Sequence, residues 1–334
     1  MKKNFTYFYT NNKNIFHNEE KITKMAKIHT AGETVFDIIF ENGAPTGGHP
    51  GGSVLNTSVT LGRIGLLPCF LTDICGDMLG CNIKSFLNSN GVTPHSVIDD
   101  KGMSTSVALA FLDEKKNARY QFYKSRPGKC HTELFDADFG QDDIFLFGSF
   151  YGIMPEIREG MRRLISLAKD NGAIIVYDPN FRAPHLPQLP QVMPFIEENI
   201  AAADIIKGSD EDFALIFNAK DRNDAFDSIR SINSNAAIFY TMGAEGCCYQ
   251  HNGNIIECKA PKIEPVSTIG AGDNFNAGIV YGVVKHNISR QAIHQGIGAD
   301  TALDIMNIST EFAQKVCMSK ENYISAEFAA KHRL

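Results

Sequence analysis

The sequence predicts an α/β protein in which helices cover both faces of a mainly parallel sheet, with a small additional β lid. Short apolar strands alternate with amphipathic helices through most of the 334 residues, a pattern typical of parallel sheets buried on both faces. Several strands end in glycine-rich turns. A predicted hairpin near residues 104–124 interrupts the alternation. We interpret it as a lid over the carboxyl ends of the strands, where such sheets bind ligands.

The elements before residue 130 are assigned from the spacing of their apolar residues and from the turn residues between them. Val54, Leu55, Val59 and Leu61 recur near helical spacing. Glycines and the polar run DEKKN mark the turns. The predicted strands are 28–40 with a turn at Gly32, 68–76, 105–113 and 118–124, and the predicted helices are 53–65 and 78–91, the latter ending at Gly91.

The elements after residue 140 follow a regular strand–helix order. Buried strands are indicated by short apolar runs such as AIIVYDPN, which stops at a proline. The segment PEIREGMRRLISLAKDNG is an amphipathic helix that ends at a glycine. The predicted strands are 143–150, 173–180, 203–209 and 235–243, and the predicted helices are 155–172, 210–218, 272–286 and 289–306.

Composition and charge exclude several classes of function. The formal net charge is −6 and no large basic cluster is present, which argues against a nucleic-acid partner because such binding depends on Lys and Arg contacts to phosphate. No apolar run approaches the ~20 residues needed to span a bilayer, so no membrane partner is expected. The eight cysteines include no CxxC pair, which favours reduced thiols in the cytoplasm over disulfides or a metal site.

Residues 1–26 are predicted to form a tail outside the fold. They are rich in Asn, Lys and aromatic residues and lack the continuous apolar region of a signal peptide. Met25, just before the first strand, is an alternative start of translation. Residues 27–334 are predicted to form one domain, with lid strands within about 38–50 and 103–126.

The motif with the clearest chemistry is STIGAGDNFNAG, residues 267–278. Backbone N–H groups of Gly270, Ala271 and Gly272 can converge, and the helix that follows adds its positive end, so this loop is a candidate anion site. A carboxylate beside an anion is unfavourable unless a third group lies between them. A hydroxyl that Asp273 deprotonates as it attacks a phosphoryl group is such a third group. Taken alone, the motif equally fits a helix cap after an ordinary glycine turn.

A second stretch, HPGGSVLNTSVTLGRIG, places Gly51 and Gly52 before a predicted helix and Asn56 near its first turn. Two glycines permit close approach of a ligand to the backbone, and an Asn amide both donates and accepts hydrogen bonds. This combination suits a polyhydroxylated ligand. Alone, it equally fits a strand-to-helix turn with a polar cap residue.

Five motifs, GETVFD, GGSVLN, DPNFR, TMGAEG and STIGAGD, occur in that order from about residue 27 onward. In this order the chain resembles the ribokinase/PfkB family of ATP-dependent sugar kinases, and the last motif is close to that family's DTxGAGD signature. The segments LAFLDEKKNARYQFYK and DPNFR resemble the fructokinase-like branch. The resemblance implies a ribokinase-like fold, with a Rossmann-like three-layer α/β/α core and a β lid, that transfers the γ-phosphoryl group of ATP to a primary hydroxyl of a sugar.

The resemblance also implies roles for single residues. Asp273 matches the catalytic base, and Gly270, Ala271 and Gly272 match the backbone anion hole. The implied sugar contacts are Asp37, Gly51, Gly52 and Asn56, and the implied nucleotide contacts are Ser209, Thr241, Gly243, Gly246 and Asn276. By itself, Asp37 would be interpreted as a turn residue at the end of a strand.

Two positions depart from the family pattern. Ser267 replaces the Asp that begins the signature and helps relatives to bind a monovalent cation, so activation by K⁺ does not follow from the resemblance. The family's NxxE motif, which organises Mg²⁺ through waters, falls at Ser209–Asp212, where Ser replaces Asn and Asp replaces Glu. Asp212 keeps a hard oxygen ligand on a shorter arm, and Asp210 or Glu211 can compensate. The same acids also suit a helix N-terminus that binds no metal.

The acceptor is left open between fructose, 2-keto-3-deoxygluconate and ribose. A neutral ketose needs hydroxyl partners, whereas an acidic sugar needs a cation near its carboxylate. Lys124 and Arg126 of the lid and Arg182 of DPNFR are the candidate cations, although edge strands also carry such charges without function. We favour fructose and place adenosine behind these sugars.

Two other classes compete with a sugar kinase. A dinucleotide-binding oxidoreductase would show GxGxxG after the first strand, and that turn lacks it. A catalytically silent sugar-binding protein would explain the changes at Ser267 and Ser209–Asp212, but it would be free to lose Asp273 and the anion loop. ATP turnover separates it from the enzyme. We also consider a homodimer through the lid, because a small exposed sheet invites pairing.

Overall fold

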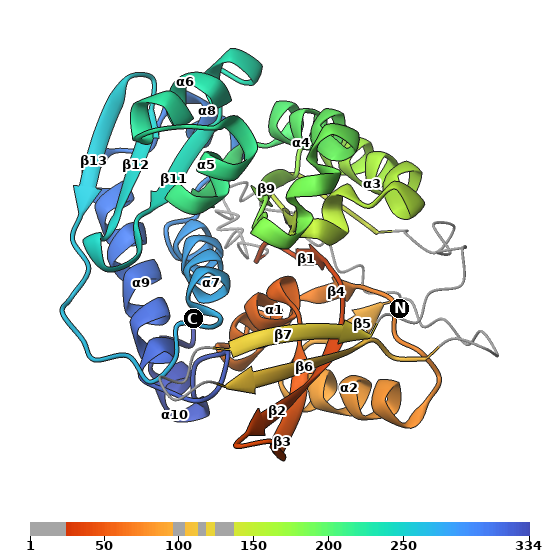
Figure 1. Cartoon of the computed structure of the whole chain (residues 1–334). Helices are drawn as coiled ribbons and strands as arrows, with labels where there is room; N and C mark the ends of the chain where they lie inside the picture. Colours follow the sequence, from red (N-terminus) through yellow and green to blue (C-terminus); the bar gives the residue numbers. More distant parts are fainter. Residues whose placement is uncertain (1–24, 96–103, 113–117, 124–136) are drawn as a thin grey trace, which may run out of the picture.

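The computed structural model describes residues 25–95, 104–112, 118–123 and 137–334 (Figure 1). Almost all of the predicted tail, and both lid cations Lys124 and Arg126, lie outside the described residues. In the part of the chain that is described, no helix is long and apolar enough to cross a membrane.

The central sheet has, among the described residues, nine strands in the order β13-β12-β11-β10-β9-β8-β1-β4-β5. Seven strands pair in parallel, and the last two in sequence are added at one edge by antiparallel pairings, so the predicted mainly parallel sheet is confirmed. The strands are β1 (Ile28–Ala31), β4 (Cys69–Leu71), β5 (Thr93–His95), β8 (Ile144–Gly148), β9 (Ile174–Asp178), β10 (Ile205–Ser209), β11 (Ala237–Thr241), β12 (Cys247–His251) and β13 (Asn254–Cys258).

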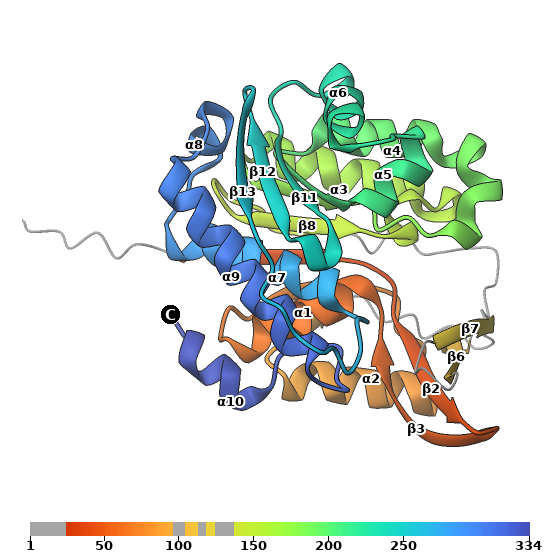
Figure 2. The same ribbon diagram turned by 60° about the vertical axis from the view of Figure 1, so that its left-hand side comes forward.

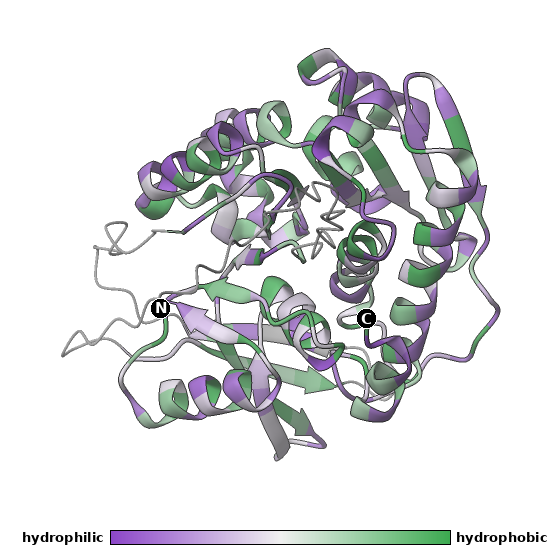
Figure 3. Ribbon diagram, turned by 180° about the vertical axis from the view of Figure 1, so that it is seen from behind, coloured by the Kyte–Doolittle hydropathy of each residue, from purple (hydrophilic) through white to green (hydrophobic). Residues whose placement is uncertain are grey.

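Helices cover both faces of this sheet, which confirms the three-layer architecture. Strand side chains alternate between two buried clusters: Leu146 and Val176 pack with one set of helices, and Phe147 and Tyr177 with the other. In Figure 3 the strands and central helices are mostly hydrophobic, and the outer helices carry many of the hydrophilic residues. The first set is α1 (Ser53–Arg63), α2 (Met78–Ser89), α7 (Ala271–Lys285) and α9 (Ala299–Cys317); the second is α3 (Arg158–Asp170), α4 (Leu189–Ala202), α5 (Asp210–Phe217) and α6 (Arg222–Ile232).

The lid is a separate sheet in the order β3-β2-β6-β7. It contains the predicted hairpin, with β6 and β7 antiparallel, and Figure 2 shows the β2 and β3 ends projecting away from the core. The strands of the lid are β2 (Val35–Glu41), β3 (Ala44–Gly51), β6 (Val107–Leu112) and β7 (Ala118–Tyr123).

One prediction was wrong at the first strand. Residues 28–40 form two strands in two different sheets, because the chain leaves the core after Ala31 and enters the lid at Val35. Gly32 lies at the crossing, where a Cβ atom would lie 2.5 Å from the Cβ of Val54. The lid therefore begins before residue 38, and Asp37 lies inside β2 rather than at a strand end.

The structure also divides one predicted helix in two and contains elements that the sequence analysis did not predict. The predicted helix 289–306 is divided into α8 (Arg290–Gln295) and α9, because Gly296 between them has φ +92°. The hairpin β12–β13 was missed, although its turn residues Asn252 and Gly253 both have positive φ, as an Asn-Gly hairpin turn requires. Helices α4 and α6, the short strand β5 and the short helix α10 (Ala326–Ala329) were also missed.

Candidate active site

The glycine loop and the start of α7 form a rigid backbone concavity. Gly270 caps the helix with φ +80°, and a Cβ atom there would lie 2.7 Å from the carbonyl oxygen of Asn322. The amide of Asn274 donates to the carbonyls of both Gly270 and Asn322, each at 2.8 Å. First-turn N–H groups of a helix have no acceptor within the helix, so those of Gly272 and Asp273 are available to an anion.

Asp273 is held by α1, which lies more than 200 residues earlier in the sequence. Its Oδ1 accepts a hydrogen bond from the Ser53 hydroxyl at 2.6 Å, and its Oδ2 accepts one from the Asn56 amide at 2.8 Å. The hydroxyl of Thr57 donates to its carbonyl oxygen at 2.8 Å. Sequence reasoning missed Ser53 and Thr57, although their spacing with Asn56 places all three on one turn of the helix. The structure therefore places Asn56 against the expected base.

The environment of Asp273 suits a group that exchanges protons near neutral pH. Burial raises the pKa of its carboxyl to about 6, although hydrogen bonds from Ser53 and Asn56 and the charge of Lys207 act in the opposite direction. A base with a pKa just below the working pH is ionised and still accepts a proton effectively.

This pKa predicts an acid limb in the rate. We expect kcat at saturating sugar to fall about tenfold per pH unit once the pH drops below about 6, since the protonated carboxyl of Asp273 accepts no proton. The ratio kcat/KM would also include Asp37, whose pKa burial raises to about 7. Above that pH the carboxylate is ionised and the limb ends. Steady-state rates across a pH series, with enzyme stability checked at each pH, measure it. A rate without an acid limb would contradict the assignment of Asp273 as the base.

Asp37 lies where the lid joins the core. A Cβ atom on Gly51 would overlap its carboxylate, so only glycine there permits this approach. Gly52 follows with φ +130°. Nε2 of His49 lies 4.0 Å from Oδ2 of Asp37, and burial raises the pKa of Asp37 to about 7. A desolvated carboxylate of this kind gains from hydroxyl donors supplied by a ligand.

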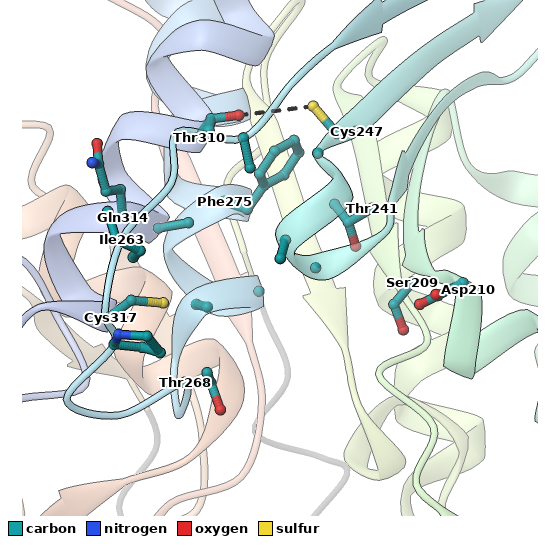
Figure 4. A pocket seen from close by; sticks show the side chains of 18 of the residues that line it. Ser209, Asp210, Thr241, Cys247, Ile263, Thr268, Phe275, Thr310, Gln314 and Cys317 are labelled. Atoms are coloured by element: carbon teal, nitrogen blue, oxygen red, sulfur yellow. Dashed lines mark hydrogen bonds between the residues drawn. The ribbon is translucent and has the colours of Figure 1, made fainter.

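A cavity of ≈ 620 Å³ opens beside the glycine loop, large enough for a small organic ligand (Figure 4). Figure 4 shows Ser209 and Thr241 on one wall and Phe275 and Cys317 on the opposite wall. One end meets the anion loop, and the other is largely apolar. The expected nucleotide contacts on the wall are Ser209, Thr241, Gly243 and Gly246; the loop contributes Ala271 and Gly272; the apolar residues include Ile263, Pro265, Phe275, Ala313 and Cys317.

Two of the predicted sugar or nucleotide contacts do not lie where the sequence analysis expected them, and a third is not described by the structure. Arg182, expected beside the sugar, lines this cavity, with its guanidinium 3.7 Å from Oδ1 of Asp212. Asn276 is buried behind the wall and donates to Oδ2 of Asp178 at 2.6 Å. Lys124 falls outside the described residues.

Asp212 serves the helix with one oxygen and leaves the other without a hydrogen bond. Its Oδ2 accepts from the backbone N–H and the hydroxyl of Ser209, at 2.8 and 2.7 Å, and completes a capping box at the start of α5. Its Oδ1 is buried without a hydrogen-bond partner. Burial, followed by the charge of Asp178, raises the pKa of Asp212. Capping and metal binding therefore need not compete for the same oxygen.

The residues that could hold a metal ion at this site are few. In the described ranges no group of three or more His, Cys, Asp or Glu residues is arranged to hold a metal ion. Oδ1 of Asp212 has no hydrogen bond, although the guanidinium of Arg182 lies 3.7 Å away. One such carboxylate oxygen fits the way Mg²⁺ is commonly held, through its waters and the phosphates of a nucleotide.

Sequence reasoning also passed over Lys207. Its side chain is buried at the carboxyl end of β10, and its ammonium donates to Oδ2 of Asp178 at 2.9 Å. The only signal in the sequence was a lysine inside the apolar strand ADIIKGS.

Comparison with known proteins gives consistent results. The family described as pfkB family carbohydrate kinase matches residues 25–299. "Probable fructokinase-4" of Arabidopsis thaliana is 26% identical over 243 residues, covering 70% of this chain and 73% of the relative. A fructokinase of Rhizobium leguminosarum bv. trifolii is 28% identical over 242 residues, covering 72% and 73%.

Solved structures show the same fold at low sequence identity. A fructokinase from Vibrio cholerae O395, in a form with fructose, ADP and calcium ion bound, superposes with a TM-score of 0.78 at 19% identity, covering 89% of this chain and 94% of that chain. An aminoimidazole riboside kinase from Salmonella enterica, complexed with aminoimidazole riboside and an ATP analogue, gives a TM-score of 0.76 at 19% identity, covering 88% and 94%.

Proposed function

This chain belongs to the pfkB family of carbohydrate kinases and is an ATP-dependent sugar kinase, and we propose that its acceptor is fructose. The observation that carries the chemistry is Asp273, a buried carboxylate with a pKa of about 6 in the first turn of α7, directly after the glycine loop. Fructose is supported by the relatives named fructokinase and by the structural neighbour with fructose and ADP bound. Arg182, a candidate cation for an acidic sugar, lines the nucleotide cavity and faces Asp212.

We infer the following mechanism. Asp37 receives hydroxyls of the sugar between lid and core, and Ser53 and Asn56 keep the carboxylate of Asp273 in place. Asp273 takes the proton of the acceptor hydroxyl while that oxygen bonds to the γ-phosphorus and the bond to ADP breaks. Backbone N–H groups of Gly272 and Asp273 stabilise the charge on the transferring group, whereas the N–H of Ala271 donates to the carbonyl of Thr268. Asp212 would hold Mg²⁺ through waters, and the ion would supply positive charge to the nucleotide phosphates.

Sugar-dependent ADP release tests the proposal. ATP·Mg²⁺ is offered with fructose, ribose, 2-keto-3-deoxygluconate, tagatose and adenosine, each with and without K⁺. The K⁺ arm is included because Ser267, whose hydroxyl accepts from the N–H of Ile269 at 3.2 Å, stands where relatives have Asp. Fructose should give the highest kcat/KM. Preference for 2-keto-3-deoxygluconate or ribose would replace fructose, and sugar binding without turnover on any acceptor would indicate the silent binding protein.

Replacing Asp37 by Ala should raise the KM for sugar by about 10- to 100-fold with a smaller change in kcat, because a hydrogen bond to a charged group contributes about 1.5–3 kcal/mol. Steady-state kinetics with sugar varied at saturating ATP measures it. The matched control is Glu159→Ala, an exposed acid in the first turn of α3, which should leave the sugar KM unchanged. An unchanged sugar KM in Asp37→Ala would remove this residue from the sugar site.

We further propose a cytoplasmic homodimer formed through the lid. By strand register, Ile38, Phe40, Leu109 and Phe111 share one lid face, none of them is fully buried, and Phe111 is 38% exposed. A second copy packed on this face would cover it, and sedimentation measures the association of the two copies.

The cytoplasmic location is supported by the described cysteines, which are free thiols, because the cytoplasm is a reducing compartment.

A further inference from the structure

Lys207 is a buried cation at the edge of the candidate active site. The residue is 3% exposed, lies two positions before the end of β10 and lines the nucleotide cavity. Its ammonium nitrogen lies 2.9 Å from the position that a Cβ atom of Gly272 would occupy. The ammonium is therefore directly beside the backbone of the anion loop.

The ammonium is anchored on one side only. Within the described part of the chain, Asp178 is its hydrogen-bond partner, at 2.9 Å, and an ammonium has three N–H donors. The other oxygen of Asp178 accepts from the N–H of Asn180 at 3.0 Å, and Asn276 donates to the same oxygen as Lys207. Asp178 thus accepts hydrogen bonds from three donors, and its carboxylate fixes the position of the Lys207 ammonium. The remaining N–H donors of Lys207 are available to a ligand in the cavity.

The location also explains why a cation is retained there. Three carboxylates, those of Asp178, Asp212 and Asp273, surround this corner, and the charge of Lys207 lowers the pKa of both Asp212 and Asp273. A phosphoryl group that enters between Asp273 and Gly272 adds further negative charge. Backbone N–H groups supply only partial positive charge, whereas a lysine supplies a full point charge.

We propose that Lys207 is a catalytic residue that binds the transferring phosphoryl group and stabilises its charge during transfer. This inference rests on the proposed phosphoryl-transfer function. Lys207 forms and breaks no covalent bond: its N–H groups donate to the non-bridging oxygens while the acceptor oxygen–phosphorus bond forms and the bond to ADP breaks. Asp178 and Asn276 are positioning residues, since they act through the lysine.

The test compares Lys207→Met with the double variant Lys207→Met/Asp178→Asn. The single variant keeps the side-chain length but leaves the carboxylate of Asp178 buried without its cation, which can disturb folding. The double variant removes one positive and one negative charge together, so the net charge of this buried corner is unchanged. Thermal unfolding should show the double variant folded at 25 °C, whether or not the single variant is.

We expect the double variant to lose kcat by on the order of 10²- to 10³-fold, as when one charge-stabilising donor is removed from an active site, with sugar KM within about threefold. Binding of ADP with aluminium fluoride and sugar, a mimic of the transferring group, should weaken by a similar factor, while ADP alone binds nearly as before. A structural role would not produce this split between the two ligands.

The outcomes distinguish a failure of the proposed role of Lys207 from a failure of the proposed kinase function. A folded double variant with near wild-type kcat and unchanged binding of the aluminium fluoride complex would overturn the role of Lys207 and leave the kinase intact. Wild-type protein that binds sugar but releases no ADP on any acceptor would overturn the proposed function, and the lysine role with it.

Discussion

Replacement of Asp273 by Asn is expected to lower sugar-dependent ADP release by on the order of 10²- to 10⁴-fold, the contribution typical of a positioned general base. Asn has the shape of Asp but accepts no proton from the attacking hydroxyl. The amide oxygen of the new side chain can still accept from the Ser53 hydroxyl. The side-chain amide of Asn56 can rotate, so that the Oδ1 of Asn56, which is buried without a partner, accepts from the new NH₂ group. The pocket therefore keeps its shape, and sugar affinity should remain nearly unchanged.

Coupled ADP release measures the rate in Asp273→Asn, and titration calorimetry measures sugar binding. The matched control is Ser53→Ala, which removes one hydrogen bond to Asp273 and keeps the carboxylate. Since that hydrogen bond lowers the pKa of Asp273, its loss should move the acid limb of the rate to higher pH and cost far less kcat. A near-normal rate in Asp273→Asn would show that another group is the base.

The second large effect is on stability, at the contact between α7 and α9. A Cβ atom on Gly278 would overlap the backbone of α9 and would lie 2.7 Å from the Oγ and 2.8 Å from the N of Ser309. Gly278→Val should therefore lower the free energy of unfolding by about 3 kcal/mol or more, the upper range for overpacked cores. Because α7 begins with the anion loop and Asp273, activity should fall in parallel.

Thermal and denaturant unfolding of Gly278→Val measure this loss. Gly298→Ala is the control: it precedes α9, has φ −60° and has open space around its Cβ position, so the change should be below about 1 kcal/mol. Equal melting temperatures for wild type and Gly278→Val would mean that the two helices can separate without cost.

The alternation of apolar strands and amphipathic helices was sufficient to predict the layered α/β core, because each period reflects which side of an element is buried. The same reasoning failed for residues 28–40. Apolar residues lie on both sides of Gly32, so the pattern fits one strand with a turn. The crossing into a second sheet is visible only in the structure, where Val54 packs against Gly32. Periodicity reports burial but not the sheet to which a strand belongs.

The candidate active site also has parts that the sequence predicted and parts that only the structure shows. The motif STIGAGD contains both the anion loop and Asp273, since a glycine turn and the helix after it are local in sequence. A single sequence could not show that Ser53 and Asn56 hold Asp273, or that Asp178 joins Asn276 98 residues later. Nor could it show that the guanidinium of Arg182 lies 3.7 Å from Oδ1 of Asp212 in the lining of the cavity.

By itself, then, the sequence was enough to predict the fold class from side-chain periodicity, and the candidate anion loop and candidate base from a local glycine–helix motif. The kinase family followed from the resemblance of five ordered motifs to the ribokinase/PfkB family. Tertiary structure alone decided that Asp37 reaches Gly51 from inside a lid strand. It alone decided that Lys207 stands against Gly272. The physical reason is that hydrogen bonds and buried charges between distant segments depend on how neighbouring strands and helices pack, and no spacing along the chain records that packing.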